Sequence, residues 1–535
     1  MILTLFKLSL FNKMNSKSKN IIWTISGSDC SGGAGIAADI KTAHSFGVEI
    51  CQLITANTVQ NSRQLWSINA VSIEVLQQQL VVLITDKPPT VIKIGLIANE
   101  AQVLWLAKAL KQLKDQIPSL ICVYDPIGRA SVSGRFHQLT TKQLKPLLAE
   151  IDVITPNIPE AQNLATPAKQ SKETNAAKLA KSIHQQFAID SVIIKGGHSD
   201  NKEFSSDYCY HQLNSLTPIK NKIQQSIGYQ LTAPRVQTHF THGTGCSFAT
   251  ALSALLAQGY LIRDALTLTK AFMQQGLMAS TDISAKHEHQ YYGAFIQSSW
   301  PKSPEYFPKV TCSISQKYQQ LSAFSSLNLS NKKLGLYPVV NSIEWLQKLL
   351  PLGLEIIQLR VKGLSESTAE IMIKSALELA KPYHTRLFIN DYWQLAIKHG
   401  AYGVHIGQED LQTADLTAIQ QAGLRLGIST HGCYEFLLTQ QLQPSYIAIG
   451  AIFSTKTKNM TGQIQGIENL KDIMALATNI PVVAIGGINL ERAETVLATG
   501  VDSIAVVTAI TEAKAPIKAV EAFQLLANNN FRLPC

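Results

Sequence analysis

Residues 20–42 read NIIWTISGSDCSGGAGIAADIKT, an apolar run that passes through a glycine-rich turn into a helix-like stretch. A strand that enters a helix in this way is the unit from which parallel sheets with helical layers are built. The turn lacks the G-x-x-x-x-G-K-[ST] pattern, so it is no Walker phosphate loop, and GGAG alone is a weak sign of dinucleotide binding. The stretch predicts an α/β domain but does not identify its ligand.

Further strand-like runs extend this pattern at 90–97, 120–126, 152–157 and 191–197. They predict a mostly parallel sheet with helices on both faces. The C-terminal half has a more regular rhythm, in which eight β-rich runs alternate with helix-like stretches in about 200 residues, as expected of a (β/α)8 barrel. The eight runs are 334–340, 355–361, 386–391, 403–408, 424–430, 446–453, 481–488 and 503–510.

The segment between the two halves is rich in Ser, Pro and Asn and shows no sustained period. We interpret it as a linker over residues 299–331, between an α/β domain at 20–298 and a barrel at 332–535. Residues 1–19 are apolar and basic without a clear cleavage site, so we expect a disordered extension and no signal peptide.

Composition is that of a soluble globular protein, with 46% hydrophobic residues and no apolar run long enough to span a membrane. The 8 cysteines form no C-x-x-C pair, which favours a reducing cytoplasm over a disulfide framework or a zinc site. The net charge of +10 is not organised into a basic and aromatic surface. We therefore expect small-molecule substrates, with neither nucleic acid nor a membrane as partner, and a homo-oligomer.

A second glycine-rich turn, THGTGC at 241–246, precedes the apolar stretch SFATALSALLAQ. The pattern predicts a helix beginning near Cys246, whose unpaired N–H groups and positive dipole end would attract an anion. Gly243 and Gly245 would let the backbone approach that anion closely. A thiol at such a position is expected to have a lowered pKa and to act as a base or nucleophile. The alternative is a small core cysteine after an ordinary turn.

Polar residues gather at the predicted strand ends of both halves. In the first half, Asn157 and Glu160 follow one strand and Lys195 ends another, which suits phosphoryl transfer. In the barrel, Asp391 and Asp410 end neighbouring strands and could hold Mg²⁺, while cationic side chains could surround an anionic leaving group. A solvated rim would also be polar, but the combination favours a phosphate-handling Mg²⁺ enzyme. The cationic residues are Arg360, Lys362 and Lys458, and Gly487 and Thr508 follow the seventh and eighth predicted strands, where this fold commonly binds phosphate.

The N-terminal half, over about residues 20–295, resembles hydroxymethylpyrimidine/phosphomethylpyrimidine kinases of the ribokinase-like fold. The motifs are SGSDCSGGAGIAADIKT, TANTVQNS, TPNIPEA, IIKGGH and THGTGC. The resemblance implies ATP as phosphoryl donor, an anion hole at Gly243, Thr244 and Gly245, and Cys246 as the base that takes the substrate's hydroxymethyl proton. It assigns Gly27, Asp39 and Gln60 to the pyrimidine, and Asn157, Glu160 and Lys195 to Mg²⁺ and ATP phosphates. The run at 127–134 departs from the family's pattern and puts the details of substrate fit in doubt.

The C-terminal half, over about 332–530, resembles thiamine-phosphate synthases through IQLRVKG, FINDYWQLA, GVHIGQEDL, LGISTH, STKTK and AIGGI. The resemblance implies that hydroxymethylpyrimidine diphosphate and thiazole phosphate are joined, with diphosphate released. Asp391 and Asp410 would bind Mg²⁺, Gln358 would orient the pyrimidine, and Ser429 would assist the departing charge. His405 and His431 are expected to be structural. Diphosphate is assigned to Arg360, Lys362, Asn390 and Lys458, and thiazole phosphate to Thr455, Thr457, Gly487, Val507 and Thr508.

Two alternatives keep the same folds. The first half could act on another alcohol, as pyridoxal-type kinases do, with a barrel that resembles a thiazole tautomerase. Alternatively, one half could be inactive and serve as a scaffold or ligand-binding regulator. A tautomerase needs no diphosphate clamp, and neither half has lost a charged group that the chemistry requires, so the bifunctional interpretation is favoured.

Overall fold

The computed structural model describes residues 20–61, 64–127, 139–165, 173–199, 201–212, 226–281, 293–327, 329, 333–455 and 464–530. The chain divides into two compact units, one formed mainly by residues up to Pro301 and the other mainly by residues from Lys302 onward. Each has its own hydrophobic core. The extension at 1–19 and, apart from Ile127, the run at 127–134 lie outside the described residues.

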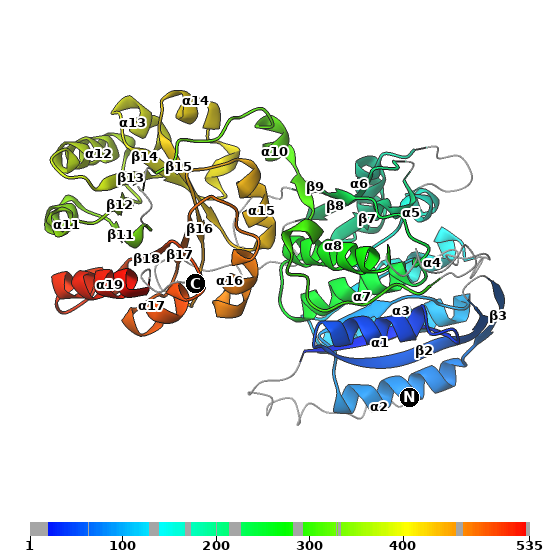
Figure 1. Cartoon of the computed structure of the whole chain (residues 1–535). Coiled ribbons are helices and arrows are strands. Elements are labelled where there is room, and N and C mark those ends of the chain that lie inside the picture. The colour runs from blue at the N-terminus through cyan, green and yellow to red at the C-terminus, as the bar shows by residue number, and fades with distance from the viewer. Residues whose placement is uncertain are drawn as a thin grey trace. The chain divides into compact units, whose positions relative to one another are not determined.

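The N-terminal unit is built on the predicted sheet (Figure 1). Neighbouring strands from β2 through β1, β4, β5 and β6 to β7 are parallel, and β3 and β8 pair antiparallel with β2 and β7. The order of these strands is β8-β7-β6-β5-β4-β1-β2-β3. Strand β10 pairs antiparallel with residues 230–232 of β9, and both of these segments belong to the other unit. The mostly parallel sheet is therefore confirmed. The strands are β1 (Ile21–Asp29), β2 (Glu49–Gln60), β3 (Leu65–Ala70), β4 (Val91–Ile94), β5 (Ile121–Tyr124), β6 (Val153–Ile154), β7 (Ser191–Ile194), β8 (Phe204–Gln212), β9 (Ser226–Pro234) and β10 (Lys309–Thr311).

Side chains of β1 alternate between two helical layers, as the pleat requires. Trp23 and Ile25 join the core shared with α2, α3, α4 and α6, whereas Thr24 bonds to Asp39 of α1 on the other face. Helix α7 packs against both α1 and α8. The helices are α1 (Gly35–Ser45), α2 (Ile73–Asp86), α3 (Glu100–Gln116), α4 (Thr141–Leu148), α5 (Ile158–Ala165), α6 (Ala176–Phe187), α7 (Thr244–Ala257) and α8 (Ile262–Ala279), with the short η2 (Gly196–His198).

The C-terminal unit is a closed barrel of eight parallel strands, which confirms all eight predicted runs. Gly403 and Gly427 leave space inside it, because a Cβ at either position would overlap the ring of Phe388 or Tyr446. The strands are β11 (Gly335–Val340), β12 (Ile356–Leu359), β13 (Arg386–Asn390), β14 (Gly403–Ile406), β15 (Arg425–Thr430), β16 (Tyr446–Ile449), β17 (Val482–Ile485) and β18 (Ser503–Val506). The helices are α11 (Ile343–Leu349), η4 (Leu350–Leu352), α12 (Glu366–Ala380), α13 (Trp393–Lys398), η5 (Asp410–Gln412), α14 (Leu416–Gln421), α15 (Cys433–Gln441), α16 (Gly466–Met474), α17 (Leu490–Leu497), α18 (Thr508–Thr511) and α19 (Pro516–Asn530).

The segment interpreted as a linker is more ordered than its composition suggests. It carries η3 (Pro304–Tyr306), β10 and α10 (Ser313–Lys317), and then lies against the barrel. The Tyr318 hydroxyl donates to the carbonyl of Ala414 at 2.8 Å, and Leu327 is 2% exposed within the barrel core. These contacts join residues about a hundred positions apart, so a local pattern could not reveal them.

Candidate active sites

The predicted anion-binding turn stands at the start of α7, which begins at Thr244. Gly243 has φ of 82°, a conformation that glycine adopts without strain, and a Cβ there would overlap the carbonyl oxygen of Gly33. The backbone N–H of Gly35 donates to Cys246 Sγ at 3.3 Å. The two glycine-rich turns quoted from the sequence therefore pack directly on each other, and glycine is required where they meet.

Asp29 holds these two turns together, although the sequence did not mark it as a site residue. Its carboxylate accepts hydrogen bonds from the N–H groups of Ser31 at 2.8 Å and Ala34 at 2.9 Å, and lies 2.8 Å from His242 Nε2. Burial alone would raise the pKa of Asp29, but the hydrogen bonds from His242 and Ser31 outweigh burial and lower it. Asp29 is therefore an anion that fixes the loop geometry.

Cys246 is buried, and its pKa is not lowered as the helix start predicted. Burial raises the pKa of the thiol to about 11, because desolvation of a thiolate outweighs the opposing charge of Lys93. The charges of Asp39 and Asp125 act in the same direction as burial. The expectation of a lowered pKa is thus wrong for this structure, and the thiol is protonated at neutral pH.

Asp39, assigned by resemblance to the pyrimidine, lies in a fully buried charge network. Lys93 Nζ is 2.8 Å from its carboxylate, and the hydroxyls of Thr24 and Thr250 donate to it at 2.5 and 2.7 Å. Burial opposes the charge on Lys93, but Asp39 and Cys246 outweigh it and raise the pKa of the lysine. Asp39 thereby fixes a cation close to Cys246, while its pyrimidine role stays a prediction.

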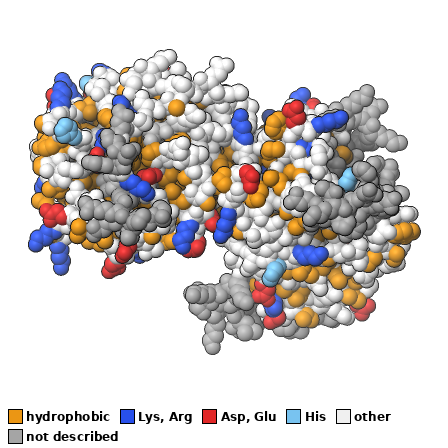
Figure 2. Space-filling view, viewed as in Figure 1, with side chains coloured by type: hydrophobic (Ala, Val, Ile, Leu, Met, Phe, Trp, Pro, Cys, Tyr) orange, Lys and Arg blue, Asp and Glu red, His pale blue; other side chains and the backbone are white. Residues whose placement is uncertain are grey.

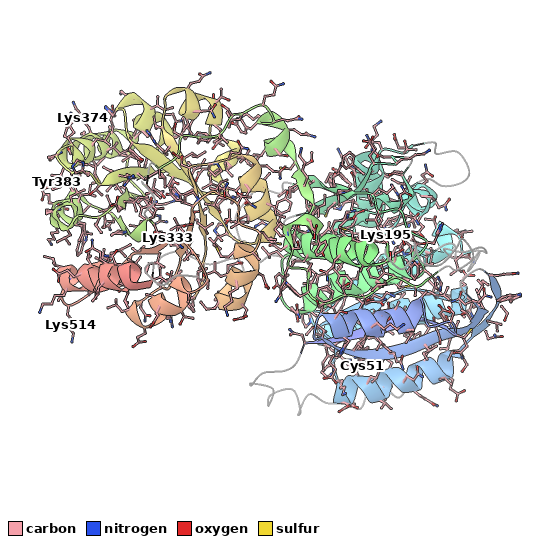
Figure 3. The ribbon with its side chains drawn as sticks, viewed as in Figure 1. Cys51, Lys195, Lys333, Lys374, Tyr383 and Lys514 are labelled. Carbon is pink, nitrogen blue, oxygen red and sulfur yellow. The ribbon has the colours of Figure 1, made fainter. Side chains whose placement is uncertain are left out.

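A second buried ion pair lies at the ends of β5 and β7. Lys195, which is labelled in Figure 3, directly follows β7. Its Nζ is 2.6 Å from Asp125 Oδ1, which also accepts from Thr155 Oγ1 at 3.2 Å. Asp125 Oδ2 is buried and has no hydrogen-bond partner among the described residues. A Cβ at Gly245 would come within 3.2 Å of that oxygen. An unpaired buried carboxylate oxygen beside an anion-binding turn suits a cation that accompanies phosphate.

Asn157 and Glu160 stand at the start of α5 and cap it reciprocally. The N–H of Asn157 donates to Glu160 Oε2 at 2.8 Å, and the N–H of Glu160 donates to Asn157 Oδ1 at 3.0 Å. Glu160 also contributes, after burial and Asp125, to the charge balance of Lys195, whose pKa is raised. The structure thus brings all three predicted ATP-region residues to neighbouring strand ends.

Gly27 and Gln60 lie toward the ends of β1 and β2. The thiol of Cys30 donates to the carbonyl of Gln60 at 3.0 Å, and a Cβ at Gly35 would overlap the carbonyl oxygen of Gly27. Gly27 and Gln60 therefore border the turn that follows Asp29 at the end of β1. Besides Asp29, sequence reasoning missed His242, Lys93 and Asp125; only the strand-end position of Asp125 offered a signal.

In the barrel, the two predicted metal-binding carboxylates are neighbours. Burial and the charge of Asp391 raise the pKa of Asp410, and Lys362 Nζ lies 2.9 Å from Asp391 Oδ2. Asp391 has φ of 65°, a strained value for a residue with a side chain, and such strain often marks functional positions. No group of three or more Asp, Glu, His or Cys gathers among the described residues. Two carboxylates still fit Mg²⁺, which commonly takes its remaining oxygens from water and substrate phosphates.

The neighbouring strand ends supply hydrogen-bond donors. Asn390 is 5% exposed, and its Nδ2 has no hydrogen-bond partner in the described part of the chain. The Gln358 amide is buried and donates to Tyr337, while Ser429 Oγ lies 2.8 Å from His405 Nε2. Arg360 follows β12 directly. These groups flank the Asp391–Asp410 pair on adjacent strands, as the barrel order requires.

The predicted thiazole-phosphate residues lie after β16, β17 and β18. Gly487 has φ of 64°, and a Cβ there would come within 2.5 Å of the carbonyl oxygen of Ser454. Val507 caps α18, which starts at Thr508, and Thr455 ends the described part of the loop after β16. Thr457 and Lys458 lie outside the described residues.

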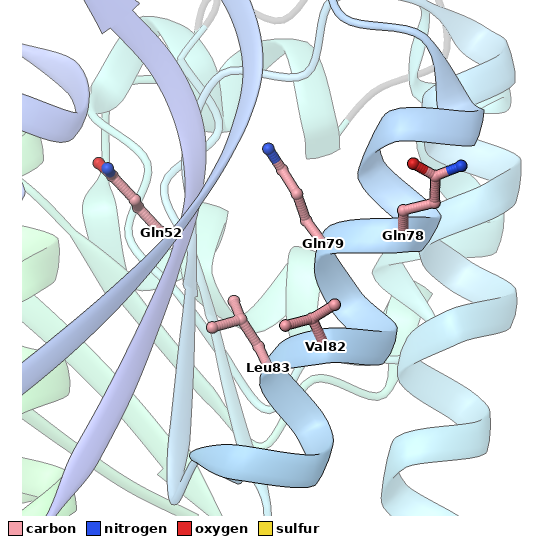
Figure 4. Close-up of a pocket in the computed structure, with 5 residues that line it drawn as sticks. All are labelled: Gln52, Gln78, Gln79, Val82 and Leu83. Carbon is pink, nitrogen blue, oxygen red and sulfur yellow. The ribbon is translucent and has the colours of Figure 1, made fainter.

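Features of the described surface include a hollow, the distribution of basic side chains and the apolar character of the helices, and none of these adds a charged group to the two candidate sites. A hollow between β2 and α2 is lined by Gln52, Gln78, Gln79, Val82 and Leu83 and carries no charged side chain (Figure 4). On the face in Figure 2, Lys and Arg side chains of the described residues are scattered, several of them beside Asp or Glu, and they form no continuous basic patch. No described helix has the length and apolar character needed to cross a membrane.

The chain contains two α/β units, each with polar and charged groups at its strand ends, and comparisons with known proteins relate both units to enzymes that act on phosphate compounds. Residues 29–290 match the family described as phosphomethylpyrimidine kinase, and residues 336–510 match the family described as thiamine monophosphate synthase. Thiamine-phosphate synthase from Yersinia pseudotuberculosis (serotype O:1b, strain IP 31758) is 57% identical over 182 residues, which are 34% of this chain and 85% of the relative. The enzyme from Klebsiella pneumoniae is 56% identical over 181 residues, 34% of this chain and 86% of its own length.

The chain therefore belongs to the thiamine-phosphate synthase family, joined in one polypeptide to a phosphomethylpyrimidine kinase domain. Among solved structures, phosphomethylpyrimidine kinase from Clostridium difficile 630 is 26% identical, with a TM-score of 0.38, over 50% of this chain and 99% of that one.

Proposed function

We propose that this chain is a bifunctional enzyme of thiamine biosynthesis. Its N-terminal unit would phosphorylate hydroxymethylpyrimidine and then its monophosphate with ATP. Its barrel would join the resulting diphosphate to thiazole phosphate, giving thiamine phosphate and diphosphate. The observation that carries the proposal is the match of each unit to one of the two families, with the residues for each reaction gathered at strand ends.

In the kinase unit, the thiolate form of Cys246, a small fraction at neutral pH, would take the proton from the substrate hydroxymethyl as its oxygen attacks the γ-phosphoryl group. The backbone N–H groups of Gly243, Thr244 and Gly245 would stabilise the charge that develops on the transferred group. Lys195 would bind ATP phosphate, while Asp125, Asn157 and Glu160 offer oxygens to Mg²⁺. When bound, Mg²⁺ would neutralise phosphate charge there. Gly27, Asp39 and Gln60 would define the pyrimidine site.

In the barrel unit, the difficult step is departure of diphosphate, which leaves a pyrimidine-methyl cation for the thiazole nitrogen to capture. Arg360, Lys362, Asn390 and Lys458 would hold the leaving diphosphate, and Ser429 would donate to it. Asp391 and Asp410 would hold Mg²⁺, which would supply further charge neutralisation. Gln358 would orient the pyrimidine, and Thr455, Thr457, Gly487, Val507 and Thr508 would hold thiazole phosphate.

The test is a coupled reaction. Purified protein is incubated with hydroxymethylpyrimidine, ATP, Mg²⁺ and thiazole phosphate, and products are followed by mass spectrometry. Thiamine phosphate is the expected product. Accumulation of pyrimidine diphosphate alone would refute the barrel's role, and an untouched pyrimidine alongside condensation of supplied diphosphate would refute the kinase's role. A cytoplasmic location and a homo-oligomeric state also stay predictions.

A further inference from the structure

A continuous row of hydrogen bonds crosses the interior of the barrel and joins two of its proposed substrate-binding side chains. It starts at the Gln358 amide on β12, which donates to the Tyr337 hydroxyl at 3.1 Å. The Tyr337 and Tyr446 hydroxyls lie 2.8 Å apart, and the Tyr446 hydroxyl is 2.8 Å from His405 Nδ1. His405 Nε2 is in turn 2.8 Å from Ser429 Oγ. Five side chains from five strands thus form one row.

The surroundings hold this row in place. Tyr337 and Tyr446 are at most 1% exposed, and their rings meet edge to face at 5.8 Å. The His405 ring stacks on Tyr446 at 5.6 Å with 18° between the planes. The Tyr446 ring fills the space that Gly427 leaves, because a Cβ at Gly427 would overlap it. The rings therefore cannot turn aside without disturbing the packed interior.

Proton counting gives the row a direction. Burial raises the pKa of both tyrosines, so each keeps its one hydroxyl proton and can donate only once. Because Tyr337 accepts from the Gln358 amide nitrogen, its own proton finds an acceptor within the row only at the Tyr446 hydroxyl, and the Tyr446 proton then goes to His405 Nδ1. His405 must then carry its own proton on Nε2 and donate it to Ser429 Oγ. The Ser429 proton is left for an acceptor outside the row.

We propose that this row is a positioning device for the condensation reaction: it fixes His405 as the Nε2–H tautomer and thereby makes Ser429 a donor to the departing diphosphate. The inference rests on the proposed function of the barrel. His405, Tyr446 and Tyr337 are positioning residues here, because they act through Ser429. At the other end, the same direction leaves Gln358 Oε1 as an acceptor for the amino group of an aminopyrimidine.

The reverse direction makes a different chemical prediction. If the Gln358 amide were turned, Ser429 would donate to His405 Nε2, and His405 would carry its proton on Nδ1. Ser429 would then have only lone pairs to offer, which repel an oxyanion. An anionic leaving group beside Ser429 favours the proposed direction, because it needs a hydrogen-bond donor. A substrate amino group beside Gln358 favours the same direction, because it needs an acceptor, so the two ends of the row are consistent with each other.

The first experiment reads the tautomer of His405 in the full-length protein. We would label histidine with ¹⁵N and record ring nitrogen shifts by NMR, with a His405→Gln variant to assign the signal. A protonated Nε2 and an unprotonated Nδ1 are expected. A protonated Nδ1, or both nitrogens protonated, would overturn the proposal. This readout does not need catalysis, so it decides the direction even if the protein fails to condense substrates and the proposed function falls.

The second experiment is a double-mutant cycle on condensation from supplied pyrimidine diphosphate. Tyr446→Phe keeps the ring but removes the proton that fixes His405, so kcat is expected to fall about tenfold with KM for thiazole phosphate unchanged. Ser429→Ala should lower kcat at least as much, and adding Tyr446→Phe to it should cost less than a further twofold. If the kcat losses of the two single variants multiply in the double variant, Tyr446 acts independently of Ser429, and the proposal is overturned.

Two controls separate positioning from general damage to the fold. Tyr402→Phe removes a hydroxyl that donates to the Leu327 carbonyl at 3.2 Å in the same barrel but outside the row, and it should leave condensation within twofold. The kinase rate of every variant should match that of the unmodified protein, because these residues belong to the other unit. If Tyr402→Phe lowered kcat for condensation as much as Tyr446→Phe does, the positioning role assigned to the row would be contradicted.

Discussion

The two sites both handle phosphate, but they hold their charges in opposite ways. In the kinase unit, the side chains of Lys93 and Asp39 are both 0% exposed, and Lys195 is 14% exposed beside Asp125. At the barrel rim, Lys362 is 57% exposed beside Asp391. Buried charges are costly unless paired, so the first set is fixed in place, whereas the Lys362 ammonium at the rim remains largely hydrated.

This difference suits the two proposed reactions. Phosphoryl transfer depends on exact placement of the donor, the acceptor and one base, and on keeping water away. Condensation instead depends on binding and releasing a highly charged diphosphate, which a largely hydrated cation at the rim can accompany. The expected consequence is that single changes do more harm in the buried site than at the rim.

The largest effect is expected from Cys246→Ala. Removal of a general base should lower the kinase rate by about 10²–10⁴-fold, while condensation from supplied diphosphate stays unchanged. Both rates are measured on the same preparation. Cys51→Ala, at another buried cysteine of the same unit, is the matched control and should keep kinase activity. Equal losses in both reactions would refute the division of labour.

Lys195→Met should break the buried pair and leave Asp125 unpaired. Stability of the N-terminal unit should fall by about 3–5 kcal/mol, and kinase activity should be lost with it. Denaturant unfolding gives the first quantity, read beside condensation activity as a report on the barrel. The double variant Lys195→Met/Asp125→Leu should regain stability but not activity. A Lys195→Met variant as stable as the unmodified protein would show that the pair is not strongly desolvated.

These pairs mark where sequence reasoning reaches its limit. Strand ends in both units could be predicted because period and composition are local, and so Asp391, Asp410 and Lys195 could be placed before their contacts were known. The Asp29–His242 and Lys93–Asp39 contacts join residues 213 and 54 positions apart, and no local pattern connects them. The Cys246 pKa was wrongly predicted for the same reason: the helix start is visible in the sequence, but the burial that outweighs it is not.

At the rim, Asp410→Asn should lower condensation roughly 10²-fold at low Mg²⁺ and less when Mg²⁺ is raised. The reason is that one of two carboxylates for the cation is lost while Asp391 remains. Initial rates over a Mg²⁺ titration give the result. Glu409→Gln removes the same charge from the exposed neighbouring position and should leave the titration unchanged. An Asp410→Asn variant with an unaltered Mg²⁺ dependence would mean that this carboxylate is not a ligand.

The two reactions should also differ in how their rates depend on pH. Because the Cys246 thiol has a pKa of about 11, the thiolate fraction rises about tenfold per pH unit between pH 7 and 9, and the kinase rate should rise with it. Condensation needs no general base, so its rate should not rise with the thiolate fraction. The raised pKa also predicts how stability depends on pH. The unfolded thiol ionises near pH 9 but the folded thiol near 11, so the unfolded state is favoured by losing the proton first. The N-terminal unit should therefore lose stability as pH rises from about 9 to about 11. A flat kinase profile over pH 7–9 would exclude Cys246 as the base.

The smallest effect is expected from Lys362→Met. The ammonium is more than half exposed, so its pairing with Asp391 contributes at most about 1 kcal/mol, and its loss should raise the KM for pyrimidine diphosphate only several-fold. That effect should shrink further at high salt, because hydrated charges are screened whereas buried pairs are screened much less. Condensation kinetics at two ionic strengths test both points, with Lys374→Met on α12 as an exposed control. If Lys362→Met proved as damaging as Lys195→Met and insensitive to salt, the rim would be as tightly organised as the kinase site, and the contrast between the two sites would not hold.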